Sequence, residues 1–332
     1  MSIRVTRRVR SVIDYLAMQS FDSATIVNNI HTSHSALLAF YVPLANLQNR
    51  THRRFEVERF AEWTPPQSSV AVPLGLATVL VGVNKPQVST LLDRWLDPGP
   101  YPCLNVRIVV IDRVQWQRTV WAAHSICKSL CWGRLPQKLY GISMDYQHPV
   151  HVDSEFDATL GHYTKYVATV PGRGVHIELE DTKVPLLTRG NRVVDGFLDN
   201  ESALKVLGLG REVVMRGIGG ECYRQPLWST PTHPNLAKPV KVEVTKLFED
   251  VFDCAPVGDP IVSWLVDEVP NTQIFQIEGQ IEEENDAFQS VKVGERMLVE
   301  RVQKKAQNRY NAFRDDVRAK AYSELRGEEL PR

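Results

Sequence analysis

The sequence contains few cysteines and has no surplus of either charge. Its five cysteines form no CxxC pair and no ladder of regular spacings, which excludes a disulfide framework and favours a reduced, cytoplasmic location. The 39 basic residues balance the 39 acidic residues, so no net charge is available to concentrate a polyanion. We therefore expect no nucleic-acid partner.

Long apolar runs are also missing. No stretch approaches the roughly 20 apolar residues that a membrane helix needs, so we expect no membrane partner. The first residues lack the apolar block of a secretory signal, although Arg4, Arg7, Arg8 and Arg10 precede any acid and leave a transit peptide open. A surface helix is favoured instead, because apolar residues recur at helical spacing: Val5, Val9, Val12, Ile13 and Leu16.

Several signatures of catalytic and cofactor sites are absent. The chain has no P-loop, no GxSxG and no HExxH motif, and the glycines of "GLGREVVMRGIGG" do not fit the strand, turn and helix that bind a dinucleotide. His148 and His151 lie near Asp153 and Glu155, but their spacing matches no strong metal pattern, and a solvated loop is favoured. We expect neither a cofactor nor a metal.

The sequence does contain a series of short β-type runs that starts near residue 100. No regular helices alternate with these runs, which argues against a parallel doubly wound sheet. The expected fold class is β-rich α+β, with a large antiparallel sheet or barrel. The runs are "RIVVID", "RTVWAA", "KLYGISMDY", "TKYVATV", "GVHIELE", "EVVMRGIG", "VKVEVTKLF", "IVSWLVDEV" and "TQIFQIEGQI".

Three regions are expected along the chain. Residues 1–100 form a mixed N-terminal region, helical at its start and packed on the core, and residues 101–283 form the β-rich core. Residues 284–332 carry a long amphipathic helix, whose apolar positions step by three or four from Leu298 to Ala321. Packing of this helix on its own chain is favoured, and a homo-oligomer formed through it is the alternative.

The run "GVHIELED" alternates strictly between polar and apolar residues. This alternation places His176, Glu178 and Glu180 on one face of a strand and aliphatic residues on the other. If the polar face lined an interior cavity, a base and two carboxylates would meet there, with pKa values suited to acid–base catalysis. If it faced water, the strand would be an ordinary antiparallel strand with a wet side.

The segment "GRLPQKLYG" places a lysine at the mouth of a strand. Such a lysine forms a Schiff base with a ketone when burial or a neighbouring cation lowers its pKa. Lys138 is this lysine, and Arg134 is the nearest basic residue in the sequence. A solvated lysine in a loop is the alternative interpretation.

The order of features from about Tyr101 to Asp253 resembles the acetoacetate decarboxylase superfamily. "LPQKLYGISMDY" is similar to the family segment in which a proline precedes two lysines, the first forming the Schiff base and the second lowering its pKa. Pro136 falls on that proline and Lys138 on the second lysine. "THPNLAKPVKVEVTKLFEDVFD" is similar to the closing segment of the family. The resemblance covers about half of the chain and implies an acetoacetate decarboxylase-like fold around a cavity.

The sequence departs from the family at positions that carry the decarboxylase chemistry. Gln137 stands at the position of the Schiff-base lysine, and an amide cannot form an imine. A family glutamate in a Tyr-x-Glu context falls on Cys103. Consecutive strand residues point to opposite faces, so Lys138 would replace the missing nucleophile only if the loop were bulged.

The resemblance therefore implies a lyase or isomerase of biosynthesis that acts without a covalent intermediate. The expected partner is a β-keto or polyketide-like substrate, and the expected reaction is cyclisation, isomerisation, dehydration or decarboxylation. In this scheme Lys138 stabilises charge, Gln137 orients the substrate and Arg134 binds an anion. His176 or Glu178 donates or accepts a proton.

Two other classes of function stay open. A β-rich chain with a terminal amphipathic helix also fits a non-catalytic assembly protein, such as a viral coat-type subunit. An accessory protein that binds a ligand without transforming it needs the same pocket as an enzyme. An enclosed polar cavity distinguishes both small-molecule hypotheses from the assembly hypothesis.

Overall fold

The computed structural model describes residues 26–280, with gaps at 67, 87–98, 115–116, 129–143, 189, 192, 195, 198, 210–211, 217–221, 230–231 and 276–277. The predicted helices at the two ends of the chain lie outside the described residues, as do Arg134, Gln137 and Lys138. None of the helices in the described part is long and apolar enough to cross a membrane.

The described elements are mostly strands. They are β1 (Ile26–Pro43), α2 (Leu44–Gln48), β2 (Phe55–Val57), β3 (Ala61–Trp63), β4 (Val72–Pro86), β5 (Tyr101–Asp112), β6 (Gln117–Cys127), β7 (Met144–Asp145), β8 (His151–Asp157), β9 (His162–Val170), η2 (Pro171–Arg173), β10 (Val175–Pro185), α5 (Asn200–Ala203), η3 (Leu204–Leu209), β11 (Glu212–Arg216), β12 (Cys222–Ser229), β13 (Asn235–Glu243), α6 (Thr245–Phe252), β14 (Val257–Phe275) and β15 (Glu278–Gln280).

The described strands form one 15-stranded sheet, whose main order is β15-β12-β11-β6-β5-β4-β1-β14-β13-β10-β9-β8. A large strand-rich sheet is confirmed, but it is mixed, because β11 and β7 both run parallel to β6. The order has two ends, β15 and β8, so the expected barrel is not closed. β12 also pairs with β14, so the sheet curls until these two strands meet.

The N-terminal region contributes two of the central strands. β1 pairs with β14 on one side and with β4 on the other, and β4 pairs with β5. The expected boundary at residue 100 therefore falls between two paired strands of one compact unit. The sequence did not predict β1, because the first half of this strand is mostly polar and a bulge interrupts its alternation of polar and apolar residues.

The run "VKVEVTKLF" is not a continuous strand. β13 ends at Glu243, and α6 begins at Thr245. Leu247, Phe248 and Phe252 of α6 recur at helical spacing and are all buried. The prediction of a strand through this run was wrong, because the β-branched residues before Thr245 hid the change of period.

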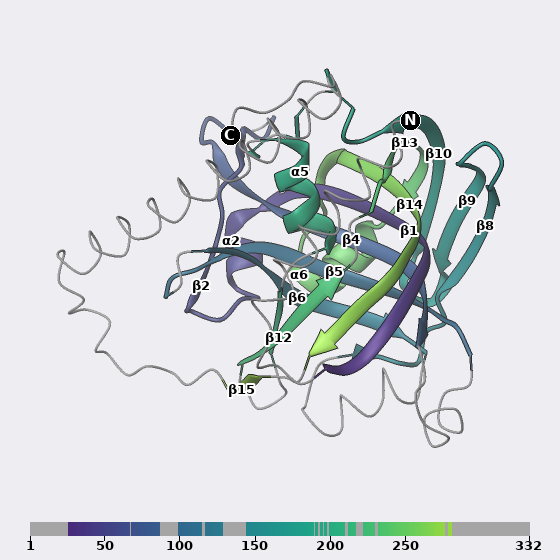
Figure 1. Ribbon diagram of the computed structural model, residues 1–332. Helices are drawn as coiled ribbons and strands as arrows, with labels where there is room; N and C mark the ends of the chain where they lie inside the picture. The colour runs from purple at the N-terminus through teal and green to yellow at the C-terminus, as the bar shows by residue number, and fades with distance from the viewer. Residues whose placement is uncertain are drawn as a thin grey trace, which may run out of the picture. The chain divides into compact units, whose positions relative to one another are not determined.

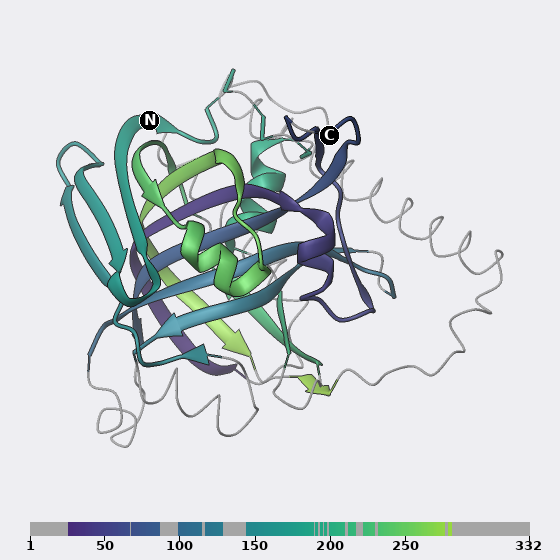
Figure 2. The ribbon, with the colours of Figure 1, turned by 180° about the vertical axis from the view of Figure 1, so that it is seen from behind.

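Apolar clusters cover both faces of the central sheet. One cluster includes α6 residues and the side chains of Leu104, Val106 and Ile108 on β5. The other includes Val109 of β5 and residues of α5 and η3. Figure 1 shows α5 on one side of the sheet, and Figure 2 shows α6 on the other. The central strands are therefore buried on both faces.

A buried ion-pair triad joins three separate segments at the end of β5. Both carboxylate oxygens of Asp112, which has no exposed surface, accept hydrogen bonds from Arg54 at 3.0 and 2.9 Å. Arg224 of β12 donates to the same carboxylate at 2.6 Å. Asp112 thus fixes β12 and the chain before β2 against β5.

We expect Asp112→Asn to lower the free energy of unfolding by about 3 kcal/mol or more, because it leaves the buried guanidinium of Arg224 and the partly buried guanidinium of Arg54 without their anion. Urea unfolding followed by circular dichroism measures this loss. Asp253→Asn is the matched control, because Asp253 pairs with Arg50 but its side chain is 75% exposed. The control should lose much less stability. Equal losses in the two variants would contradict a structural role for the triad.

Candidate functional site

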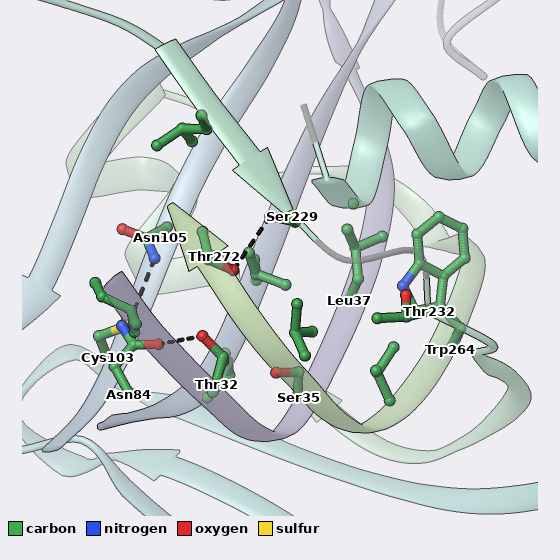
Figure 3. Close-up of a pocket in the computed structure, with 18 of the residues that line it drawn as sticks. Thr32, Ser35, Leu37, Asn84, Cys103, Asn105, Ser229, Thr232, Trp264 and Thr272 are labelled. Atoms are coloured by element: carbon green, nitrogen blue, oxygen red, sulfur yellow. Dashed lines mark hydrogen bonds between the residues drawn. The ribbon is translucent and has the colours of Figure 1, made fainter. Parts of the chain in front are cut away.

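A cavity of about 170 Å³ lies on the face of the sheet that α5 and η3 cover. Side chains of β1, β4, β5, β12 and β14 line it, together with residues of η3. These strands surround one space because the sheet curls between β12 and β14. Figure 3 shows polar side chains gathered at one side of the cavity and Trp264 at the other.

A bulge in β1 determines which of its side chains enter the cavity. His34 has a positive φ of 49°, and the β1–β4 register shifts between Ser33 and Ala36. The extra residue reverses the alternation, so that Thr32 lines the cavity before the bulge and Ser35 and Leu37 line it afterwards. The bulge therefore brings two hydroxyl groups of one strand to the same side.

Gly82 of β4 makes room for this bulge. A Cβ atom at position 82 would lie 2.7 Å from Oγ of Ser35, closer than van der Waals contact allows. Gly82 itself lines the cavity next to Ser35. The glycine is needed here for close approach of two strands.

Three polar side chains of β5 line the cavity, and they occupy every second position of the strand. Cys103, Asn105 and Arg107 line the cavity, whereas the intervening side chains enter the apolar cluster on the other face. The sequence "CLNVR" thus contains the period-two signal of a strand with a polar inner face. Asn105 and Arg107 were not predicted as site residues, because "GVHIELED" has the same alternation and was interpreted as the polar cavity face.

The polar side of the cavity is a connected hydrogen-bond group. Thr32 Oγ1 donates to Asn84 Oδ1 at 2.8 Å, and Asn84 Nδ2 donates to Cys103 Sγ at 2.9 Å. Asn105 Nδ2 donates to the same sulfur at 3.6 Å, and its Oδ1 accepts from Ser125 Oγ at 2.8 Å. Two amide donors therefore converge on one thiol (Figure 3).

The Cys103 thiol stays protonated at neutral pH. Burial raises its pKa to about 11, although the positive charge of Arg107 and the amide donors of Asn105 and Asn84 act in the opposite direction. A neutral thiol thus stands where the family resemblance places a glutamate. The polar side of the cavity contains hydrogen-bond donors but no anion from the described residues.

Arg107 is the charged group of the cavity lining. Burial lowers its pKa to about 10, so the guanidinium remains protonated at neutral pH. Nη1 donates to the main-chain oxygen of Gly208 in η3 at 3.5 Å, and no carboxylate in the described part of the chain forms an ion pair with it. A guanidinium has five N–H donors, and within the described residues the bond to Gly208 engages one of them.

None of the described lining side chains is a carboxylate or an imidazole. His176 and Glu178 lie on β10, away from the cavity lining, and their side chains are 30% and 43% exposed. His176 Nε2 is 3.7 Å from Glu178 Oε2, so the polar face of "GVHIELED" does bring them together. Val175, Ile177 and Leu179 are buried on the opposite face, as the alternation predicts.

The segment that carries Arg134, Gln137 and Lys138 lies outside the described residues, but the described positions on either side of it are close to the cavity. Ser125 of β6 pairs with Met144 of β7, and its hydroxyl bonds the cavity residue Asn105. Cys127 lies opposite Cys103 in the β5–β6 ladder. The predicted roles of the three segment residues stay predictions.

A second polar cluster holds the chain just after β7. Asp145 accepts hydrogen bonds from Nε and Nη2 of Arg173, at 2.9 and 2.6 Å, and contacts His148 Nδ1 at 2.7 Å. Arg173 also bonds Asp250 of α6. His148 therefore has a carboxylate partner, and no group of three or more His, Cys, Asp or Glu within the described ranges is arranged to hold a metal ion.

The Asp145 carboxylate is stabilised in its ionised form. Burial alone would raise its pKa, but hydrogen bonds from Arg173, from His148 and from the backbone N–H of Gln147 outweigh this effect and hold the pKa at about 2. The cluster thus favours the folded state while Asp145 is ionised. It attaches β7 to η2 and α6.

No protein-family model and no curated protein matches the sequence. Among solved structures, the enduracididine biosynthesis enzyme MppR with HEPES buffer bound is similar, with a TM-score of 0.50 and 10% identity over 80% of this chain and 92% of that chain. An acetoacetate decarboxylase-like enzyme from Sphingomonas wittichii RW1 has a TM-score of 0.47 and 10% identity, over 76% of this chain and 91% of that chain.

Acetoacetate decarboxylase from Legionella pneumophila has a TM-score of 0.42 and 8% identity, over 78% of this chain and 90% of that chain. The predicted fold is confirmed by the match to MppR, whose TM-score is 0.50. Identities this low show the fold alone, so the site must be interpreted from its own geometry.

The contribution of Asp145 to stability should depend on pH. Its folded pKa lies below the unfolded value of about 4, so its stabilising effect is present above that value and is lost as the pH falls toward about 2. The difference in free energy of unfolding between the wild type and Asp145→Asn should be largest near neutral pH and shrink in this acidic window. Denaturant unfolding across the pH range measures it. An equal difference at neutral and acidic pH would be inconsistent with this account.

Proposed function

We propose that the protein is a small-molecule enzyme whose substrate is a small keto acid, and that Arg107 binds the carboxylate of this substrate. The observation that carries the proposal is a protonated guanidinium in a cavity whose other described lining groups are neutral. Burying an unpaired charge is costly, and a carboxylate ligand removes this cost by forming charge-assisted hydrogen bonds.

The size of the cavity supports a short substrate. A volume of about 170 Å³ is close to that of an engineered cavity of about 150 Å³ that holds benzene. By that comparison the cavity accommodates roughly six to ten non-hydrogen atoms. A four- to six-carbon keto acid fits this range, so a β-keto acid of this length is favoured over a polyketide-like compound.

The neutral donors beside Arg107 suit the keto oxygen. Asn84 and Asn105 each donate one amide N–H to Cys103, and each amide nitrogen has a second N–H. Donors fixed by other hydrogen bonds can stabilise negative charge that develops on a carbonyl oxygen during enolisation or decarboxylation. This arrangement supports non-covalent lyase or isomerase chemistry.

The segment residues retain the roles that the sequence predicts, now as parts of this proposal. Lys138 stabilises the developing charge, Gln137 orients the substrate, and Arg134 is a second anion-binding group. His176 and Glu178 are proposed as a proton-transferring pair only if a conformational change brings β10 to the substrate, because neither lines the cavity. A cytoplasmic location also stays a prediction.

A second function is a ligand-binding protein that carries out no reaction. The absence of a carboxylate or an imidazole among the described lining residues favours this alternative, because proton transfer needs such a group. Turnover of a bound keto acid distinguishes the two functions. A cavity with several polar lining groups favours both of these functions over a non-catalytic assembly protein.

We expect Arg107→Gln to weaken the binding of 3-oxobutanoate by about 100-fold, because the charge-assisted hydrogen bonds to the carboxylate are lost. Isothermal titration calorimetry measures the dissociation constant. Arg216→Gln is the matched control, since Arg216 is an exposed arginine of β11 outside the cavity lining. If both variants bound the acid as the wild type does, Arg107 would not be the carboxylate site.

We expect no borohydride-trapped adduct on Lys138 when the wild type is incubated with 3-oxobutanoate, because the proposed chemistry is non-covalent. Peptide mass spectrometry locates any adduct. Gln137→Lys restores an amine at the Schiff-base position of the family and should become trappable. A trapped adduct on Lys138 would refute the non-covalent mechanism.

The proposed role of Lys138 as a charge stabiliser is tested by a turnover assay. Lys138→Ala should lower kcat by about 100-fold, because the stabilisation of the developing charge is lost.

A further inference from the structure

Two tyrosines of β9 hold the bulge of β1, and neither of them lines the cavity. The hydroxyl of Tyr166 donates a hydrogen bond to the main-chain oxygen of His34 at 3.1 Å. The hydroxyl of Tyr163 lies 3.3 Å from Nδ1 of the same histidine and donates to the main-chain oxygen of Val266 at 3.2 Å. Both tyrosines are buried. His34 is therefore fixed through its main chain and through its ring.

The main chain at His34 needs this support. Between Ser33 and Ala36, β1 has two residues, whereas the facing part of β4 has one, Gly82. One residue of β1 is therefore extra, and a bulge leaves such a residue outside the ladder. The positive φ of His34 is a strained conformation for a residue other than glycine, and it persists only where surrounding contacts hold it. The two tyrosine hydroxyls are contacts of this kind.

The position of the bulge affects the Asn84 amide through Thr32. Thr32 lies two residues before His34, and its Oγ1 donates to Oδ1 of Asn84, as Figure 3 shows. This hydrogen bond fixes the orientation of the amide, so that its N–H groups and not its oxygen are on the side of Cys103. Without the Thr32 hydroxyl the amide can turn over, and its oxygen would then repel the keto oxygen of a substrate.

The two halves of β1 differ in how firmly they are held. Ala36, Leu37 and Leu38 follow the bulge and have no exposed surface, so the close-packed core fixes them. Thr32 and Ser33 precede the bulge and are only half-buried. Loosening of the bulge therefore displaces the Thr32 side of the strand before it displaces the core side.

We infer that Tyr166 is a positioning residue, which acts through the β1 bulge and Thr32 to keep the Asn84 amide directed at the keto oxygen of the substrate. The inference rests on the proposed function, because the amide donor is part of it. Arg107 binds the carboxylate from β5 and does not depend on this bulge. Loss of the Tyr166 hydroxyl should therefore change recognition of the keto oxygen and leave binding of the carboxylate intact.

Two acids of equal size measure recognition of the keto oxygen separately from binding of the carboxylate. 3-Oxobutanoate has a keto oxygen where 3-methylbutanoate has a methyl group, and both have the same number of non-hydrogen atoms. Calorimetric titration of the wild type should give about tenfold tighter binding of 3-oxobutanoate, the effect of one hydrogen bond. Tyr166→Phe removes only the hydroxyl and should reduce this preference to about twofold, because the donor is no longer held in place.

A double variant tests whether Tyr166 acts through Thr32. Thr32→Val should reduce the preference as much as Tyr166→Phe does, and the two changes together should reduce it no further, because both act on one amide. Ser263→Ala is the matched control, since the buried Ser263 hydroxyl donates to the main-chain oxygen of Ala237 at 2.7 Å but does not line the cavity. The control should lose stability and keep the preference.

The outcomes separate this inference from the proposed function. If the wild type prefers 3-oxobutanoate and Tyr166→Phe keeps the full preference, the role of Tyr166 is overturned and the proposed function stands. A further loss in the double variant would show that Tyr166 and Thr32 act independently, which also overturns the inference. If the wild type binds both acids equally and Arg107→Gln weakens both, carboxylate binding stands and the role of the amide fails together with the inference. If neither acid binds, the proposed function itself fails.

Discussion

An open sheet encloses a cavity only if strands far apart in its order approach each other, and the β12–β14 pairing meets this requirement here. Leu227 to Ser229 pair with Thr272 to Ile274, and the five strands between β12 and β14 in the main order must curve to allow it. Ser229 and Thr272 lie at this junction and line the cavity. The buried Asp112 triad also holds β12 against β5. The position of every lining side chain therefore depends on long-range pairings.

The charges of the side chains that line the cavity differ from those that the resemblance implies. A neutral thiol at Cys103 stands where the resemblance places a glutamate, while Arg107, four residues further along β5, stays protonated. The described lining thus has a net positive charge rather than a compensated pair. A site of this kind favours an anionic ligand through its electrostatic potential as well as through direct hydrogen bonds.

The sequence predicts which residues share a strand face more reliably than it predicts where that face points. "GVHIELED" and "CLNVR" both alternate, but only the second presents its polar side chains to the cavity. Local sequence contains no information on this difference, because the neighbours of each strand decide it. The bulge at His34 changes the alternation within β1, so Thr32 and Ser35 could not be assigned to one face. The β-rich fold class and the family resemblance were accessible because they depend on patterns spread along the chain.

The close contact between Gly82 and Ser35 links two positions that are distant in the sequence. A Cβ atom at position 82 would lie 2.7 Å from Oγ of Ser35 and 3.0 Å from Cγ2 of Thr32. During evolution, position 82 therefore cannot acquire a side chain unless the bulge in β1 is rebuilt. Homologous sequences that keep the bulge should therefore keep a glycine at position 82, and only a chain that has lost the bulge is free to replace it.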